Sequence, residues 1–548
     1  MAETTSIDDM EAKQGSSADS MMIEESKDME TPDVQNAAMK IERARGAYRD
    51  YEDHKPSKLE IWSWYLYGLC SYFVLTILVP VVFPLIISQI HPSPVRGSDK
   101  SSIGLVCEPH QMELYEKVTR RSISVKNLHF SPLEWTSISW VAGLILSSPL
   151  IPLISTHLDY SHNQQLIAGA ATGIGSLFFL PVGFFNTTLI FPLYITAIVA
   201  AYVVASASHT RHLGLMVRGF TGAALHKSQF PARRGVSSWF SLYSTVFGCL
   251  GSAVMSAFTY HMLTKHAGER LVSLWVVSIF SGVKWLLLGI FHVISIKPGA
   301  VTAPMDSSSK PYYYYFLSLF KYPHAVGTLA VVFLSSFTTM SIFTGGLLHL
   351  VGQQCLEPIF ILYFFLTYFI FPSFSLPLSQ PLQQLIKADS VKMQLAGFFL
   401  AVVTSGVGYH FKENKWEKQH ILVFAGIHST CTGLLHAFGR VLLLDCSPHG
   451  REGAFSLWFS WVKTLGTCAG FALASAFPGN ISASFRIAFC TAVIGIFTLI
   501  FGNISDVGGA KAAGVVVHQD SSDKGSPLDT TSSIIIKQPL HHDHHQTT

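Results

Sequence analysis

Apolar residues along the chain gather into long, uninterrupted runs that short polar segments separate. A run of roughly 20 apolar residues is long enough to cross the hydrocarbon core of a bilayer as an α-helix. Twelve such runs predict spans near residues 59–90, 133–154, 165–185, 189–206, 237–263, 270–293, 325–350, 358–378, 393–411, 419–442, 454–477 and 486–504. The third and fourth runs are divided only at residues 185–188, where we expect a tight hairpin. The pattern predicts an all-α membrane protein.

Two of these runs repeat one another. The segments SSWFSLYSTVFGCLGSAVMSAF (237–258) and SLWFSWVKTLGTCAGFALASAF (456–477) agree at eleven of twenty-two positions. The agreements include Trp239 with Trp458 and Gly251 with Gly470. The repeat relates the fifth span to the eleventh, as in transporters that are built from two similar halves. We therefore expect twelve transmembrane helices in two pseudo-symmetric six-helix halves.

The expected organisation is an acidic tail, two helical halves and a second tail, with bounds 1–57, 58–294, 295–324 (a cytosolic linker), 325–505 and 506–548. The first 55 residues hold 14 acidic and 7 basic residues and no long apolar run, which is typical of a disordered segment. Over the whole chain only 13% of residues are charged, about half the share in soluble proteins. No basic patch with interleaved aromatic residues indicates a nucleic-acid partner.

The positions of Lys and Arg predict the orientation of the spans. The segment before the first span and the segment after the fourth, residues 211–234, are rich in Lys and Arg, and with twelve spans they share one side of the membrane. That side and both termini are expected to be cytosolic. The loop at 91–132, which is also basic but carries four acidic residues, is expected on the far side.

The cysteines and the terminal histidines leave alternatives open. Most of the eight cysteines fall within spans as small packing residues, but a disulfide between Cys107 and Cys355 in the far-side loops stays open. The cluster at 541–545 (His-His-Asp-His-His) has metal-binding side chains, although such a run in a disordered tail more often has no specific role. We expect no metal and no cofactor. No nucleophile elbow, phosphate loop or zinc-protease spacing occurs, so we do not expect an enzyme.

Ionisable side chains inside spans cost about 3 kcal/mol and therefore mark candidate sites. Lys463 lies near the middle of the eleventh span and Lys284 lies in the sixth. Each is a candidate to bind a substrate carboxylate or phosphate, and the alternative is a lysine that pairs with a carboxylate or reaches an interface. His428 and His436, on one face of the tenth span, are candidates for proton coupling or for helix packing.

The loop after the second span resembles a conserved loop of the major facilitator superfamily. The stretch STHLDYSHNQQ (155–165) is similar to that family's Gly-x-x-x-Asp-x-x-Gly-basic loop, with Asp159 in place and other residues at the glycine and basic positions. The resemblance implies the two-half fold and makes Asp159 a conformational latch.

Within that superfamily, the chain resembles the autophagy-related vacuole-effluxer branch, which is associated with amino-acid export from vacuoles. The segment WYLY that ends at Tyr67 is similar to that branch's Trp-Tyr-Leu-Tyr-Asp motif, and the stretch from Arg440 through Glu452 is similar to its Arg…Pro…Glu segment. Arg486 matches an Arg before the last span. The resemblance adds Arg440 and Glu452 to the latch. Gly68 replaces the first motif's Asp, and the seventh span also lacks the branch's Asp-Gly pair, which puts cation coupling in doubt.

These observations predict a secondary transporter that moves a small organic solute, first of all an amino acid, by alternating access. We expect the substrate to bind near Lys463, His428, Trp458, Trp239 and Tyr67, with Lys284 as a further candidate. The alternative is a non-transporting sensor or scaffold that acts through its cytosolic tails. The partners are a small solute and the lipid bilayer. We expect a monomer, in the vacuolar or lysosomal membrane by resemblance, with the plasma membrane as the alternative.

Overall fold

The computed structural model describes residues 55–90, 109–298, 317–509 and 516–517, apart from positions 186, 222–224, 227–229, 266–267, 413–415, 449, 479, 503 and 506. Most of the N-terminal tail, Cys107, the middle of the linker and the histidine cluster at 541–545 lie outside the described residues. The expectations for these segments stay predictions.

The described chain is almost entirely helical. Its N-terminal part contains α3 (Lys58–Phe73), η1 (Val74–Val82), α4 (Phe83–Ile90), α5 (Pro109–Thr119), β1 (Ile123–Val125), β2 (Leu128–Phe130), α6 (Pro132–Ser147), α7 (Leu150–Tyr160), α8 (Gln164–Leu177), η2 (Leu180–Gly183), η3 (Thr188–Ile190), α9 (Phe191–Thr221), β3 (Leu225–His226), α10 (Phe230–Lys265) and α11 (Arg270–Ser295). Its C-terminal part contains η4 (Ser318–Lys321), α13 (Pro323–Gly352), α14 (Pro358–Ile370), α15 (Pro372–Leu385), α16 (Ser390–His410), α17 (Lys418–Cys446), α18 (Glu452–Ala476), α19 (Ile481–Phe501) and β4 (Val516–Val517).

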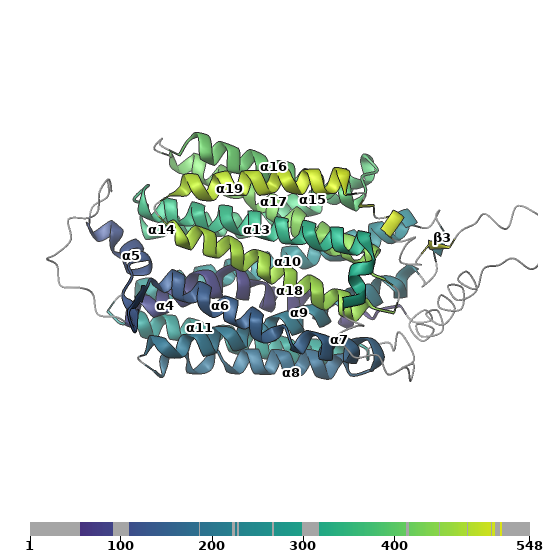
Figure 1. Ribbon diagram of the computed structural model, residues 1–548, viewed down its shortest axis with the longest axis horizontal. Helices are drawn as coiled ribbons and strands as arrows, with labels where there is room; N and C mark the ends of the chain where they lie inside the picture. The colour runs from purple at the N-terminus through teal and green to yellow at the C-terminus, as the bar shows by residue number, and fades with distance from the viewer. Residues whose placement is uncertain are drawn as a thin grey trace, which may run out of the picture.

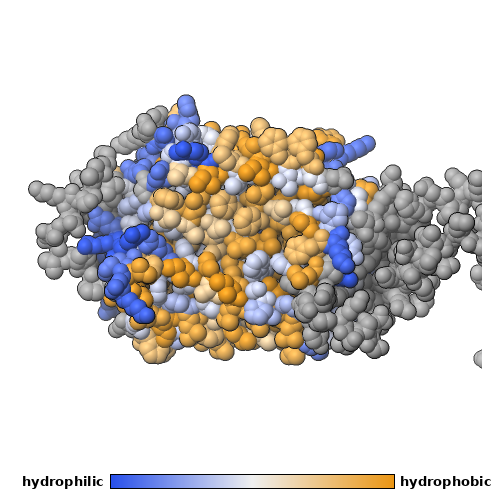
Figure 2. All heavy atoms as spheres, in the orientation of Figure 1, coloured by the Kyte–Doolittle hydropathy of each residue, from blue (hydrophilic) through white to orange (hydrophobic). Residues whose placement is uncertain are grey.

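Ten helices in the described residues are long and apolar enough to cross a membrane, and an eleventh span results if α6 and α7 count as one bent helix. The protein is therefore a multi-pass, all-α membrane protein. α18, at 25 residues, is also long enough to span but is not among them. Figure 2 shows apolar side chains over the middle of the visible face and hydrophilic side chains toward its two ends, as a bilayer-embedded protein requires.

Several helices extend beyond the expected spans. α9 continues to Thr221, so Arg211 and Arg218 lie on a helix and not in the loop that the sequence pattern predicted. The hairpin between the third and fourth spans is confirmed as two short 3-10 turns, η2 and η3. Prolines bend the long helices because they remove backbone hydrogen bonds: Pro80 lies inside η1, and α6 and α7 meet at 52° beside Pro149.

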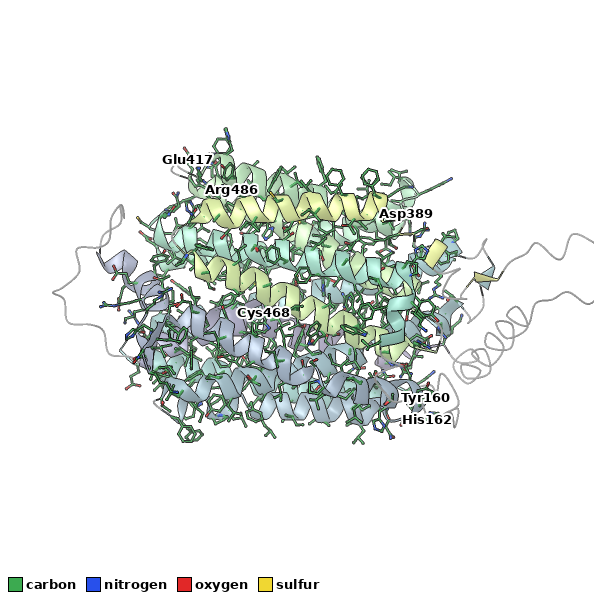
Figure 3. All side chains as sticks on the ribbon, viewed as in Figure 1. Tyr160, His162, Asp389, Glu417, Cys468 and Arg486 are labelled. Carbon is green, nitrogen blue, oxygen red and sulfur yellow. The ribbon has the colours of Figure 1, made fainter. Side chains whose placement is uncertain are left out.

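The long helices run side by side along the longest axis of the molecule (Figure 1). α8 and α11 lie along one long side and α16 and α19 along the other, while α5 lies at one end and β3 at the opposite end. Figure 3 labels Tyr160, His162 and Asp389 at the β3 end and Glu417 and Arg486 at the α5 end. We call these the Asp159 end and the α5 end.

Contacts between elements divide into packing within each part of the chain and packing between the parts. Among the N-terminal helices α3 packs on α10 and α11, and α8 packs on α9 and α11; among the C-terminal helices α13 packs on α18 and α19, and α16 packs on α17 and α19. Between the two sets, α10 contacts α14, α15 and α17, and α18 contacts α6, α7 and α9. The seam between these sets holds the candidate site.

Candidate functional site

A cavity of about 70 Å³ lies between the two sets of helices, about midway along them. It is bounded by α3 and η1, α9, α13, α14, α17 and α18. Its lining side chains are Tyr72, Leu75, Thr76, Tyr202, Ser335, Ser336, Thr339, Met340, Phe343, Tyr368, Thr432, Leu435, His436, Lys463 and Thr467. Hydroxyl groups, aromatic rings and two nitrogen bases therefore face a small space, and no described residue with a carboxylate lines it.

Lys463 reaches this cavity because it lies halfway along α18, the helix that packs against α13 on one side and against α6, α7 and α9 on the other. It also lines an adjoining cavity of about 30 Å³ with His209, His436 and Arg440. Three basic groups from two C-terminal helices thus meet one histidine from α9. A site with this lining favours an anionic group through charge-assisted hydrogen bonds.

Arg440 joins the two sets of helices inside the bundle. Its guanidinium donates to Ser244 Oγ at 3.2 Å, to the Ser241 carbonyl at 2.9 Å and to Thr245 Oγ1 at 2.6 Å, all on α10. Ser241 Oγ in turn donates to the carbonyl of Ala437 on α17, at 2.7 Å. The latch role that the resemblance implies for Arg440 would therefore act in the middle of the seam and not at its end.

Asp159 binds the start of α18 at the Asp159 end. Its carboxylate accepts the backbone N–H groups of Gly453 at 2.6 Å and Ala454 at 3.0 Å. These are first-turn amides that have no partner within their own helix, and the helix dipole favours a negative charge beside them. Asp159 thus joins the N-terminal helices to α18 through two hydrogen bonds, and its latch role stays a prediction.

Two further ion pairs cross the seam at the same end. Arg218 donates to Glu452 at 2.8 Å, which places the predicted latch residue Glu452 beside Asp159. Arg233 lies 3.8 Å from the carboxylate of Asp445, and both side chains are buried. Together with Asp159, these contacts close the Asp159 end in this conformation.

The α5 end is closed differently. A cavity of about 160 Å³ lies between η1, α4, α10, α13 and α14, with an apolar lining, and α5 covers it. Tyr115 of α5 packs against Gly352, and Glu113 of α5 pairs with Lys117 at 2.9 Å and with Arg270 at 3.1 Å. The hydrogen bond from Lys117, helped by the charge of Arg270, lowers the pKa of Glu113 although partial burial opposes this shift. Within the described residues, one short helix covers this end, and no ion pair there joins two of the long helices.

The two histidines predicted on α17 have different surroundings. His436 lines the central cavity, where its ring lies 5.3 Å from that of Tyr72. His428 is fully buried, and its Nε2 lies 3.2 Å from the backbone carbonyl of Thr339. Tyr67 is also buried away from the cavity, with its hydroxyl 3.1 Å from Thr172 Oγ1.

The remaining predicted residues lie outside the cavity. Lys284 of α11 lies over the ring of Phe73, 4.8 Å from its centroid, inside the N-terminal helices. Trp239 is 38% exposed, and Trp458 packs edge-on against Phe320, with ring centroids 5.0 Å apart. Only Lys463 and His436 of the predicted binding and coupling residues therefore line the cavity, and Arg440 from the latch set joins them in the adjoining one.

Sequence reasoning missed the hydroxyl groups of the site. Ser335, Ser336 and Thr339 on α13 all line the cavity, and Thr467 lies one turn after Lys463 on α18. Their spacing of three and four residues places them on one helix face, and that spacing was the signal that could have identified them. Tyr72 lies five residues after the motif residue Tyr67 and carried no such signal.

Cys355 is disulfide-bonded, and the six other cysteines within the described residues form no disulfide. Cys107, the partner proposed for it from sequence, lies outside the described residues. No group of three or more metal-binding side chains occurs in the part of the chain that the structure describes.

No protein-family model matches this chain, and no curated protein matches it. The resemblance to the major facilitator superfamily therefore stays a prediction that rests on the residues themselves.

Proposed function

We propose that this protein is a secondary transporter that moves a small organic anion by alternating access between two six-helix halves. The observation that carries the proposal is the cavity with Lys463 at the seam between two sets of helices, closed at one end by contacts that all cross that seam. A rocking motion that broke the Asp159, Arg218 and Arg233 contacts would open the Asp159 end without unfolding either half.

The packing of the repeated segments supports twelve spans and a pseudo-twofold relation. α10 packs on α3 within its set and on α14, α15 and α17 across the seam, while α18 packs on α13 within its set and on α6, α7 and α9 across it. The repeated glycines make equivalent close contacts. Gly251 faces the carbonyl of Leu69 on α3, and Gly470 faces the carbonyl of Phe337 on α13. α18 would be the twelfth span, tolerated despite its polarity because it lies inside the bundle.

The charge distribution supports a cytosolic Asp159 end. Arg211, Arg218, Arg233 and Arg234 all belong to the helices that meet there, and positive residues favour the cytosolic side. Both chain termini would then be cytosolic, and α5 would lie on the far side. The vacuolar or lysosomal membrane remains our first proposal, on the strength of the resemblance.

The lining of the cavity supports an anionic substrate. Lys463, His436 and the nearby Arg440 offer donors to a carboxylate, but no described carboxylate lines either cavity to receive an ammonium group. An amino acid is the first solute to test. Its keto acid, which keeps the carboxylate and the side chain but lacks the ammonium, is the informative comparison.

The test is uptake into proteoliposomes of leucine, the keto acid of leucine, and isoamylamine, which keeps only the nitrogen. We expect uptake of the keto acid, of leucine, or of both, and none of the amine. Lys463→Ala removes one charged hydrogen bond, worth about 1.5–3 kcal/mol, and should lower the apparent affinity by roughly tenfold to a hundredfold. Lys392→Ala, at a lysine of α16 whose side chain is 64% exposed, is the matched control and should leave uptake unchanged.

The second candidate function is a sensor or scaffold on the same fold. It is favoured by the lack of a described carboxylate in the cavity to bind a coupling cation. Uptake of none of the three solutes, together with a cellular phenotype that follows deletion of the terminal tails, would replace the transporter proposal with this one.

A further inference from the structure

A second group of buried ionisable side chains lies within the N-terminal helices, and of its members only His209 reaches the adjoining 30 Å³ cavity. It consists of Glu60 on α3, His209 and His212 on α9, and His292 on α11. The carboxylate of Glu60 lies 2.9 Å from Nε2 of His212, and neither side chain exposes more than 2% of its surface. A buried carboxylate beside a histidine in a membrane span is costly, so the pair calls for a functional explanation.

The histidine rings form a chain toward the cavity. The ring centroids of His212 and His292 are 6.1 Å apart, and those of His292 and His209 are 5.5 Å apart, which are contact distances for aromatic rings. The ring centroid of Tyr67 lies 4.9 Å from those of both His209 and His292. His209 itself lines the 30 Å³ cavity that it shares with Lys463. The group therefore extends from the Asp159 end of α3 to the candidate site.

The polar atoms of this group are incompletely bonded. Glu60 Oε2, both ring nitrogens of His212, and His292 Nδ1 are buried and form no hydrogen bond with the described residues, although His212 Nε2 lies within ion-pair distance of Glu60. Buried polar atoms in native proteins are nearly always bonded, and an unbonded one calls for an explanation, such as a catalytic role or a bound water or ion.

The charged groups that act on this cluster come from both sets of helices. Lys297, just after α11, acts on Glu60, while Arg440 and Lys463 act on His209. No second carboxylate within the described residues is among the groups that act on Glu60. Loss of the proton from His212 would therefore leave the buried Glu60 charge without its adjacent cation.

We propose that Glu60 and His212 form a proton-binding site, with His292 and His209 as a relay between it and the central cavity. One proton is held when His212 is an imidazolium beside the ionised Glu60. Its departure leaves a neutral imidazole beside a carboxylate, so the net charge of the pair changes by one. This site would supply the coupling carboxylate that the cavity itself lacks.

α9 connects this proton site to the closed end. His212 is followed on the same helix by Arg218, whose guanidinium holds Glu452 of α18. It is preceded by Arg211, which donates to Gln164 at 2.6 Å. A shift of α9 when the Glu60–His212 pair loses its proton would disturb the contact between Arg218 and α18. The protonated pair should therefore favour the closed Asp159 end.

The test measures how often the Asp159 end opens, as the rate at which a maleimide labels the variant Ser456→Cys in proteoliposomes of the full chain. Ser456 is a buried seam residue beside Glu452. Because maleimide reacts with the thiolate, each rate is divided by the rate of a free thiol at the same pH, and the pH dependence of labelling means that of this corrected rate. We expect the corrected rate to be about tenfold faster at alkaline than at acidic pH, within the usual range of coupling between sites. Glu60→Gln should abolish the pH dependence, and His292→Gln, which leaves the pair intact, should weaken it. His349→Asn, at a buried histidine of the α5 end, is the control and should retain it.

Infrared difference spectra recorded between acidic and alkaline pH give a readout that does not depend on transport. A band from the Glu60 carboxylate or the His212 imidazolium that disappears in Glu60→Gln supports the site. If both the band and the pH dependence of labelling persist in Glu60→Gln, the proposal is overturned. The proton site rests on the proposed transport function only for its effect on the Asp159 end. If the pair titrates but the protein moves no solute, the transporter proposal is refuted and the proton site remains.

Discussion

Removal of the contact between Asp159 and α18 tests most directly how the Asp159 end is closed. Asp159→Asn keeps the size of the side chain but removes its charge and replaces one acceptor oxygen with a donor. One of the two amides, Gly453 or Ala454, then loses its partner. A hydrogen bond to a charged group contributes about 1.5–3 kcal/mol.

The neighbouring charges determine where in this range the effect falls. Burial disfavours the charged form of Asp159 most, Arg211 attracts the carboxylate, and Glu452 repels it. Because burial and the repulsion offset part of the gain, we take a value of about 2 kcal/mol for the lost contact. Each 1.4 kcal/mol is a factor of ten, so the open population should rise about thirtyfold.

The assay is maleimide labelling of Ser456→Cys at neutral pH. The reagent concentration is kept low enough that the protein closes faster than the reagent reacts, so that the labelling rate reports the open population. The matched control is Asp389→Asn. Asp389 lies at the same end (Figure 3), and its side chain accepts from the Lys392 amide of its own helix, α16, at 2.7 Å. It caps one helix but does not cross the seam. An unchanged rate in Asp159→Asn, or an equal rise in Asp389→Asn, would refute the reasoning.

Two further predictions concern stability. Gly470→Ala places a methyl group 2.5 Å from the carbonyl oxygen of Phe337 and should lower the free energy of unfolding by about 1–3 kcal/mol. Gly173→Ala in α8, where a Cβ meets nothing within 4 Å, should raise the free energy of unfolding slightly. Thermal unfolding midpoints in detergent measure both effects, and equal midpoints for the two variants would contradict the packing. Lys117, helped by Arg270, lowers the pKa of Glu113, so the contact of Glu113 with Arg270 of α11 contributes fully to the docking of α5 above the ordinary glutamate pKa and is lost as the pH falls through the lowered value. Protection of the α5 amides, measured as hydrogen-exchange rates relative to the intrinsic rates at each pH, should fall across that acidic window, and unchanged protection would show that the pair of Glu113 and Arg270 does not hold α5.

The sequence located the membrane helices because a bilayer requires about 20 apolar residues per crossing, a local property of the chain. It missed the polarity of α18, since a helix surrounded by others need not be apolar on every face. It also placed Arg211 and Arg218 in a loop, because their charges mark the end of an apolar run, although backbone bonding and packing continue the helix to Thr221.

The candidate site was only partly predictable. Lys463 was identified because an ammonium in a span is costly wherever it points. Lys284 carries the same cost, yet it packs on Phe73 and not in the cavity. Glu60 was not predicted as a site residue, since it lies in the first turn of α3 and its burial depends on His212, 152 positions away in the chain.

The chain by itself determined that the protein is helical, apolar along most of its helices and internally repeated, because these properties follow from composition and spacing. Only the tertiary structure decided which ionisable groups meet: Asp159 with the amides of α18, Arg440 with α10, and Glu60 with His212. Such pairings depend on the rotation and depth of each helix relative to its neighbours. Those are fixed by side-chain packing across the seam, at contacts between residues far apart in the sequence.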